Sequence, residues 1–288
     1  GRIVLLVRVA ESAGHSHGKG QVCPVISSDK SFDVDYQRII GGSLVKGADE
    51  GEIYLKGGLC RLPNISHLRR VVLSKDGFNV EEIDDKNIFH GVPGESEFGV
   101  EDPRITKIRG KYYMTYIGVS STHGISIYLA SSKDMRVWKR HGLIFREQNK
   151  DCVLFPEKID GEYVALNRPE TVLNFSKPGI WISYSPDLVY WGRDSSVIKP
   201  RENSTWERER VGAGAQPIKT DKGWLVIFHG VFGEGDKRIY SAGAILLDLK
   251  HPKKIIARSP LKDPLISPTN DYEKEGFVKN VVFPTVAI

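Results

Sequence analysis

Two short patterns recur along the chain, and this internal repeat constrains the fold more than any other feature. The first pattern is a turn glycine followed directly by a β-rich run, as in Gly223-Trp-Leu-Val-Ile-Phe-His229. Its five occurrences are spaced 50 to 62 residues apart and begin at Gly1, Gly51, Gly110, Gly161 and Gly223. Self-similarity at such a period indicates that one supersecondary unit is used several times in a repeat architecture.

The second pattern is Ser-x-Asp ahead of an aromatic residue, and it follows the first at a similar period. Its aspartates are Asp76, Asp134 and Asp187, spaced 58 and 53 residues apart. Each period has room for about four short strands and contains no long amphipathic helix. Four-stranded units at this period are typical of β-propeller blades. The sequence therefore predicts an all-β fold: a single domain over residues 1–288, a five-bladed β-propeller with four-stranded antiparallel blades around a central channel.

Composition and charge exclude several classes of partner. The chain has 288 residues, of which 40% are hydrophobic and 27% are charged, as in ordinary folded proteins. The net charge of +5 is small and its charges are interspersed, so we expect no nucleic-acid partner. No apolar run approaches the ~20 residues of a membrane span, and three isolated cysteines indicate neither a disulfide framework nor a zinc site. We therefore expect a cytoplasmic protein with no membrane partner and no metal.

Polar residues stand at equivalent ends of the repeats. Inner strands of a propeller converge on the channel, so we expect these residues to gather at its mouth. They are Asp102, Arg104, Lys158, Arg168 and His229. Several cations beside one or two carboxylates suit an anion next to a proton donor, and arginine and lysine bind phosphate oxygens well. A phosphate together with a sugar is the predicted ligand.

Six motifs carry a resemblance to a known family. In chain order they are Glu101-Asp-Pro-Arg104, Phe155-Pro-Glu-Lys158, Asn167-Arg-Pro169, Gly212-Ala-Gly-Ala-Gln-Pro-Ile218, Gly223-Trp-Leu-Val-Ile-Phe-His-Gly230 and Glu275-Gly-Phe-Val-Lys-Asn-Val-Val-Phe-Pro284. Together they resemble glycoside hydrolase family 130, the β-mannoside phosphorylases and β-1,2-mannosidases, over nearly the whole chain. The resemblance implies a five-bladed propeller. Family segments that would precede the first strand and follow Pro284 find no match in this sequence.

The resemblance also implies a reaction. Family phosphorylases cleave β-1,2- or β-1,4-linked mannosides with inorganic phosphate as co-substrate and no cofactor, and inversion gives α-mannose 1-phosphate. By motif match, Asp102 is the general acid, acting through the mannose 3-hydroxyl, and Arg8 contacts the mannose. The phosphate ligands implied in the same way are Arg104, Lys158, Arg168 and His229, with Lys158 shared with the sugar. We also expect the substrate to contact two glutamates beside motif positions, Glu157 and Glu209.

Hydrolysis is the first alternative. An inverting hydrolase needs a second carboxylate to activate water, whereas phosphate is already an anionic nucleophile. Glu157, Glu207 and Glu209 lie near motif positions and leave an inverting β-1,2-mannosidase open. A propeller hydrolase with three carboxylates and a non-catalytic sugar-binding propeller are further alternatives. Trp181, Trp206 and Trp224 are expected to be structural, and Trp206 is the best candidate among them for stacking on a sugar. A homo-oligomer stays open.

Overall fold

The computed structural model describes residues 2–12, 21–39, 44–46, 52–170, 175–276 and 278–287, so Gly1 and Gly51 lie outside the described residues. Regular structure there is almost entirely β, in strands β1 to β21. The helical elements are the short α1 (Asp271–Lys274) and one 3-10 turn, η3 (Gly235–Lys237). Within the described ranges no helix has the length and apolar character needed to cross a membrane.

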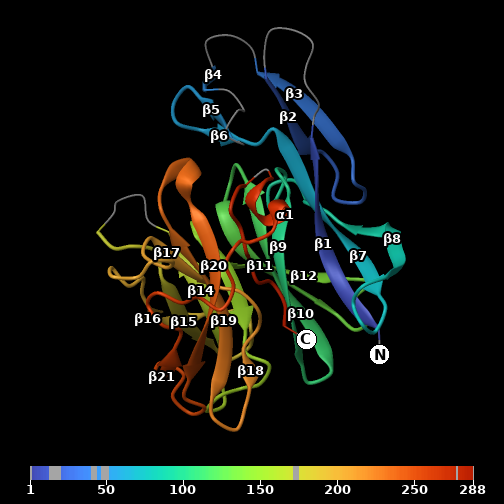
Figure 1. Cartoon of the computed structure of the whole chain (residues 1–288). Coiled ribbons are helices and arrows are strands. Elements are labelled where there is room, and N and C mark those ends of the chain that lie inside the picture. Colours follow the sequence, from blue (N-terminus) through green and yellow to red (C-terminus); the bar gives the residue numbers. More distant parts are fainter. Residues whose placement is uncertain are drawn as a thin grey trace. The chain divides into compact units, whose positions relative to one another are not determined.

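Three antiparallel sheets contain the predicted repeat unit (Figure 1). Their strands are β9 (Val100–Ile108), β10 (Lys111–Ser120), β11 (Gly124–Ser132) and β12 (Lys139–Phe145); β13 (Asn149–Leu154), β14 (Tyr163–Pro169), β15 (Ile180–Ser185) and β16 (Gly192–Ile198); and β17 (Arg210–Ala213), β18 (Ile218–Lys219), β19 (Trp224–Phe232), β20 (Ile239–Leu247) and β21 (Ile255–Arg258). Gly110, Gly161 and Gly223 stand just before β10, β14 and β19, each with a positive φ that favours glycine. These three turns confirm the first pattern.

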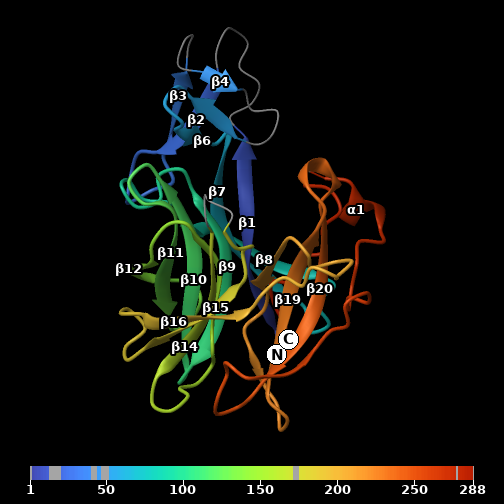
Figure 2. The ribbon, with the colours of Figure 1, turned by 90° about the vertical axis from the view of Figure 1, so that its left-hand side faces the viewer.

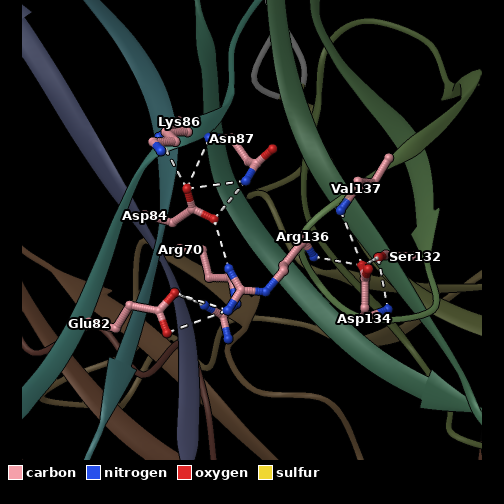
Figure 3. A network of polar contacts seen from close by, with 9 residues as sticks. All are labelled: Arg70, Glu82, Asp84, Lys86, Asn87, Ser132, Asp134, Arg136 and Val137. Atoms are coloured by element: carbon pink, nitrogen blue, oxygen red, sulfur yellow. Dashed lines mark hydrogen bonds and ion pairs between the residues drawn. The ribbon is translucent and has the colours of Figure 1, made fainter.

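The Ser-x-Asp turns confirm the second pattern. The carboxylate of Asp134 accepts backbone N–H bonds from Arg136 at 2.9 Å and Val137 at 3.1 Å, in the turn between β11 and β12 (Figure 3). Asp187 makes the corresponding two bonds between β15 and β16. Hydrogen bonds to the backbone hold the pKa of both carboxyls below their ordinary values. The repeat therefore extends to the hydrogen bonds of the turn.

A fourth blade sheet is built differently. It contains β1 (Ile3–Ser12), β7 (Asn64–Leu73) and β8 (Val80–Phe89), and β1 pairs with β7 along its whole length. The segment between β1 and β7 forms two small sheets, whose strands are β2 (Gln21–Ile26) and β3 (Val34–Ile39), and β4 (Leu44–Lys46), β5 (Ile53–Leu55) and β6 (Cys60–Arg61). The Gly51 pattern therefore precedes a three-residue strand of an insertion and not a blade. The chain is an all-β protein of the β-propeller class. The residues that the structure describes form four blade sheets, and the predicted count of five is not confirmed.

The chain divides into two compact units. The first contains residues 1–103, 116–126 and 132–138, and the second contains residues 104–115, 127–131 and 139–288. In the second unit, Phe155 packs edge-on against Trp224 with 5.1 Å between ring centroids, and β19 and β20 run side by side (Figure 2). Trp206 belongs to this core, because its ring is 3% exposed and its Nε1 donates to the Pro260 carbonyl at 2.9 Å. The expectation that Trp206 has a structural role is therefore confirmed.

Candidate active site

Asp151 is the centre of a buried polar cluster in the second unit. Arg168 Nε donates to Asp151 Oδ2 at 2.6 Å, and His229 Nε2 lies 3.6 Å from the same oxygen. The side chains of all three residues are at most 4% exposed. Pairing of β13 with β14 sets Lys150 opposite Arg168, which carries the neighbouring Asp151 to the guanidinium group. Two of the predicted site residues therefore meet at a carboxylate that the sequence reasoning missed.

Gly212 makes this close approach possible. It pairs with His229 across β17 and β19. A Cβ atom at this position would lie 2.7 Å from His229 Nε2 and even closer to Asp151 Oδ2. The glycine in the Gly212-Ala-Gly-Ala motif is thus required by the space that the histidine and the carboxylate fill.

Arg104 joins the same cluster from β9. Its Nε donates to the Gly214 carbonyl at 2.8 Å, and its guanidinium carbon lies 5.6 Å from the centre of the Phe283 ring. Phe283 packs in turn on the imidazole of His229, with 4.2 Å between centroids. The structure therefore brings together Arg104, Arg168 and His229, three of the four residues predicted to bind phosphate.

Burial and charge set the protonation of the cluster. Burial is the main cause that lowers the pKa of His229 to about 3; the nearby Asp151 carboxylate acts in the opposite direction, while Arg168 and Arg104 lower the pKa further. Burial raises the pKa of Asp151, but Arg168, His229 and Arg104 outweigh it and hold that pKa below its ordinary value. At neutral pH the cluster contains a neutral imidazole and an ionised carboxylate. Neither ring nitrogen of His229 has a hydrogen-bond partner among the described residues.

Glu170 and Arg210 extend the cluster. Arg168 Nη1 donates to Glu170 Oε1, and Arg210 Nη1 lies 3.8 Å from the same oxygen. Sequence reasoning missed both residues. Glu170 directly follows the Asn-Arg-Pro motif, so its place beside Arg168 could have been found from the sequence. Arg210 is brought to the cluster only by the packing of β17, which the sequence does not show.

Lys158 and Glu157 do not join this cluster. Lys158 Nζ donates to the Pro186 carbonyl at 3.3 Å and lies 4.3 Å from the centre of the Tyr163 ring. Tyr163 begins β14 and Arg168 stands near its end, about 16 Å further along the strand. Glu157 pairs with Lys219 at 2.5 Å. The turn that carries both residues joins β13 to β14 at the end of these strands remote from Arg168.

Glu207 and Glu209 are both engaged with cations. Glu207 is completely buried; one of its oxygens accepts from Arg201 Nε, and the other accepts from Arg258 Nη2 at 2.7 Å. This carboxylate is therefore engaged with two arginines and lies out of contact with solvent. Glu209 accepts from Lys177 and Arg208, each at 3.0 Å.

The first unit contains the predicted general acid. Asp102 lies in β9 with a positive φ of 48°, and 31% of its side chain is exposed. Arg8 Nη1 lies 3.8 Å from Asp102 Oδ1, while Arg8 Nη2 donates to Glu101 Oε1 at 2.7 Å. Arg8 therefore lies beside Asp102, and the Asp102 side chain is accessible. Among the described residues, no group of three or more His, Cys, Asp or Glu side chains could hold a metal ion.

Comparison with known proteins agrees with the six motifs. The glycoside hydrolase family 130 model, described as β-1,4-mannooligosaccharide phosphorylase, matches residues 69–288. A 1,2-β-oligomannan phosphorylase from Thermoanaerobacter sp. (strain X514) is 44% identical over 213 residues, which are 73% of this chain and 67% of that protein. A β-1,2-mannobiose phosphorylase from Listeria innocua is 35% identical, with 100% of this chain and 79% of the relative covered.

A solved structure of β-1,2-mannobiose phosphorylase from Listeria innocua, in complex with β-1,2-mannobiose, superposes with a TM-score of 0.84. It is 33% identical, and the match covers 98% of this chain and 78% of the other. The motifs, the family model and the shared fold together show that the chain belongs to glycoside hydrolase family 130.

Proposed function

We propose that this chain is an inverting β-mannoside phosphorylase, which transfers a mannosyl group to inorganic phosphate and releases α-mannose 1-phosphate. Two groups of observations support it: relatives at 33–44% identity are named as mannoside phosphorylases, and Arg104 and Arg168 lie in one cluster. Guanidinium groups bind phosphate through charge-assisted hydrogen bonds. The substrate is a manno-oligosaccharide, and phosphate is the second reactant.

One observation favours phosphorolysis over hydrolysis. The three glutamates considered as a hydrolytic base, Glu157, Glu207 and Glu209, are each paired with at least one cation. Each of these carboxylates is already engaged with its cation partner. Phosphate needs no base, because it attacks as an anion.

Asp102 acts as the general acid in this mechanism. Its proton passes to the departing glycosidic oxygen, through the mannose 3-hydroxyl as the family resemblance implies, while the C1–O bond breaks. A phosphate oxygen forms the new bond to C1 from the opposite face, which inverts the anomeric centre. Arg8 stands beside Asp102 and is placed to bind the sugar.

Arg104, Arg168 and His229 hold the phosphate in the same proposal. Arg168 supplies a planar pair of N–H donors, and the neutral His229 imidazole donates one N–H without adding charge. Asp151 accepts a hydrogen bond from Arg168, and His229 Nε2 lies 3.6 Å from the same oxygen. Lys158 is left out of this set because of its position at the other end of β14.

The names of the relatives favour a β-1,2 linkage. Proteins named for β-1,2 substrates are 44%, 42% and 35% identical to this chain. A β-1,4-mannooligosaccharide phosphorylase from Ruminococcus albus is 33% identical. We therefore propose β-1,2-linked manno-oligosaccharides as the substrate class.

Product analysis tests the proposal. The protein is incubated with β-1,2-mannobiose and with β-1,4-mannobiose, each with and without inorganic phosphate, and mannose 1-phosphate and free mannose are quantified. We expect mannose 1-phosphate from the β-1,2 substrate only when phosphate is present. Free mannose formed equally in both conditions would show hydrolysis and overturn the assignment.

We also propose that the chain is one catalytic domain with a five-bladed ring. Support comes from large apolar side chains left exposed at the last blade sheet and the segment after it, which a further blade would cover. They include Ile239, Ile256, Leu265, Ile266, Val278 and Val286. A crystal structure of the protein gives the blade count directly, and closure by four blades would contradict it.

A cytoplasmic location fits this reaction, because the cytoplasm supplies phosphate and retains a charged product. Fractionation of the source cells tests that location. Light scattering of the same purified protein tests for a homo-oligomer.

A further inference from the structure

Two carboxylates hold Arg168, and each accepts a hydrogen bond from a different nitrogen of its guanidinium group. Arg168 Nε donates to Asp151 Oδ2 at 2.6 Å, and Nη1 donates to Glu170 Oε1. A guanidinium binds phosphate best through two parallel N–H groups along one edge, either Nε with Nη2 or Nη1 with Nη2. While both carboxylates remain in place, the Nε donor is taken by Asp151, and a phosphate along the Nη1–Nη2 edge would share Nη1 with the Glu170 carboxylate. Two-point binding of phosphate is therefore favoured when one carboxylate leaves.

The surroundings decide which carboxylate can leave. The Asp151 side chain is 2% exposed, shares its oxygen with His229, and has the Gly212 backbone packed against it. The Glu170 side chain is 20% exposed and stands just beyond the last residue of β14. Glu170 is thus the carboxylate with freedom to move.

A groove beside Glu170 offers it a second position. The groove has a cavity volume of about 280 Å³, and its lining includes Glu170, Arg210, Glu234 and Arg238. Arg210 Nη1 already lies 3.8 Å from Glu170 Oε1. A Glu170 side chain that turns away from Arg168 would keep Arg210 as a cation partner. Its negative charge would therefore still be partly neutralised.

Glu170 carries a negative charge at neutral pH. Burial raises the pKa of its carboxyl, but Arg168, followed by Arg210 and Lys150, outweighs burial and holds the pKa below its ordinary value. An ionised carboxylate next to a phosphate dianion repels it, because like charges at short range are unfavourable. Departure of Glu170 removes this repulsion and frees an Arg168 donor in the same movement.

We propose that Glu170 occupies the phosphate position on Arg168 when phosphate is absent, and that phosphate displaces it into the groove lined by Arg210 and Arg238. This inference rests on the proposed phosphorolysis and deepens it, since it assigns Glu170 as the residue that sets phosphate affinity. Phosphate then binds in exchange for a carboxylate, and the buried Arg168 keeps an anionic partner throughout. Glu170 is a specificity-determining residue and takes no part in the chemistry.

The test compares phosphate binding by the wild-type protein and by Glu170→Gln, which keeps the shape and removes the charge. Phosphate affinity is measured by calorimetry without sugar, and the Michaelis constant for phosphate is measured separately from kcat. We expect Glu170→Gln to bind phosphate about tenfold more tightly, equivalent to about 1.4 kcal/mol, with kcat little changed. Glu234→Gln is the matched control, because it removes the same charge from the same groove without touching Arg168.

Each outcome bears on the proposal. Equal or weaker phosphate binding by Glu170→Gln, in a wild type that does bind phosphate, overturns the displacement and leaves the phosphorylase assignment intact. Absence of phosphate binding in both proteins overturns both. Glu170→Asp keeps the charge on a shorter side chain, so we expect an intermediate affinity, and this variant decides the matter if Glu170→Gln fails to fold.

Discussion

At the scale of single residues, Asp102 and Asp151 differ in what surrounds them. Asp102 is 31% exposed and lies beside Arg8, so a substrate can reach it. Asp151 is buried and paired with Arg168, so its negative charge neutralises that arginine inside the cluster. Both residues have a positive φ, 48° and 54°, a conformation that non-glycine residues adopt rarely and that Asp tolerates better than most. The backbone thus aims each carboxylate at a specific neighbour.

Replacement of Asp102 by Asn tests the general acid. Asn keeps the shape but has no acidic proton, so we expect turnover of the β-mannoside to fall about 10²- to 10⁴-fold. The melting temperature should change little, because the side chain is partly exposed. Asp85→Asn is the control, since Asp85 is an exposed partner of Arg69 in the same unit. Full activity in Asp102→Asn would remove Asp102 from the mechanism.

The lowered pKa of His229 predicts that the protein loses stability in acid. Its pKa is about 3 in the folded protein and near the ordinary 6.5 in the unfolded chain. Below pH 6.5 the unfolded chain therefore gains a proton that the folded protein does not take up, and the free energy of unfolding falls until about pH 3. The lowered pKa of Asp151 adds a further loss at the acid end, because its ionised form stabilises the fold only above its folded pKa.

Urea unfolding of the wild type and of His229→Gln at pH 7, 5.5 and 4.5 measures this effect. We expect the variant to be less stable at pH 7 but to lose less stability between pH 7 and pH 4.5. Parallel losses in the two proteins would mean that His229 does not carry the acid sensitivity.

At the scale of the element, Gly212 on β17 leaves the space in which the Asp151 and His229 side chains approach each other. An alanine Cβ would meet Asp151 Oδ2 and the His229 ring, so Gly212→Ala must push one of them away. We expect a loss of about 1–3 kcal/mol in the free energy of unfolding, as for other overpacking substitutions. Gly192→Ala in β16 is the control, because nothing lies within 4 Å of its added Cβ. Denaturant unfolding of the two variants measures the difference.

At the scale of the whole molecule, the ionic network in Figure 3 ties elements that are far apart in sequence. Arg136, from the turn after β11, lies 3.0 Å from Glu82 and 3.3 Å from Asp84, both on β8. Arg70 of β7 binds the same Glu82 at 2.9 Å. The Ser-x-Asp turn therefore holds its own strands together and also presents an arginine to a neighbouring sheet of the same unit.

Arg136→Ala tests how much this network contributes to the free energy of unfolding. Arg136 and Glu82 are partly exposed, so we expect a loss of about 0.5–1 kcal/mol and a smaller loss in high salt. Thermal unfolding at low and high salt measures it, with the exposed Lys133→Ala as the control from the same turn. A salt-independent loss would point to packing of the arginine stem and not to charge.

Several features could be predicted from residues alone. The glycine turns, the Ser-x-Asp turns and the Asp102 motif are local signals, since each depends on residues within one turn or strand. The placing of Gly51 in a blade was wrong, because the segment that follows it belongs to an insertion and has the same local pattern as a blade strand. Only the pairing of β1 with β7 shows that it belongs elsewhere.

What the sequence by itself determined is the repeat, the all-β class and the residue types of the site, because these follow from short-range backbone preferences and from motif order. Only the tertiary structure decided which charges meet. Asp151 reaches Arg168 through the register of β13 on β14, and Lys158 is carried to the far end of the same strand. Glu207 is paired with Arg201 and with Arg258, and Arg258 lies 51 residues further along the chain. The reason is physical: an ion pair depends on distance in space, and strand register sets that distance over long stretches of chain.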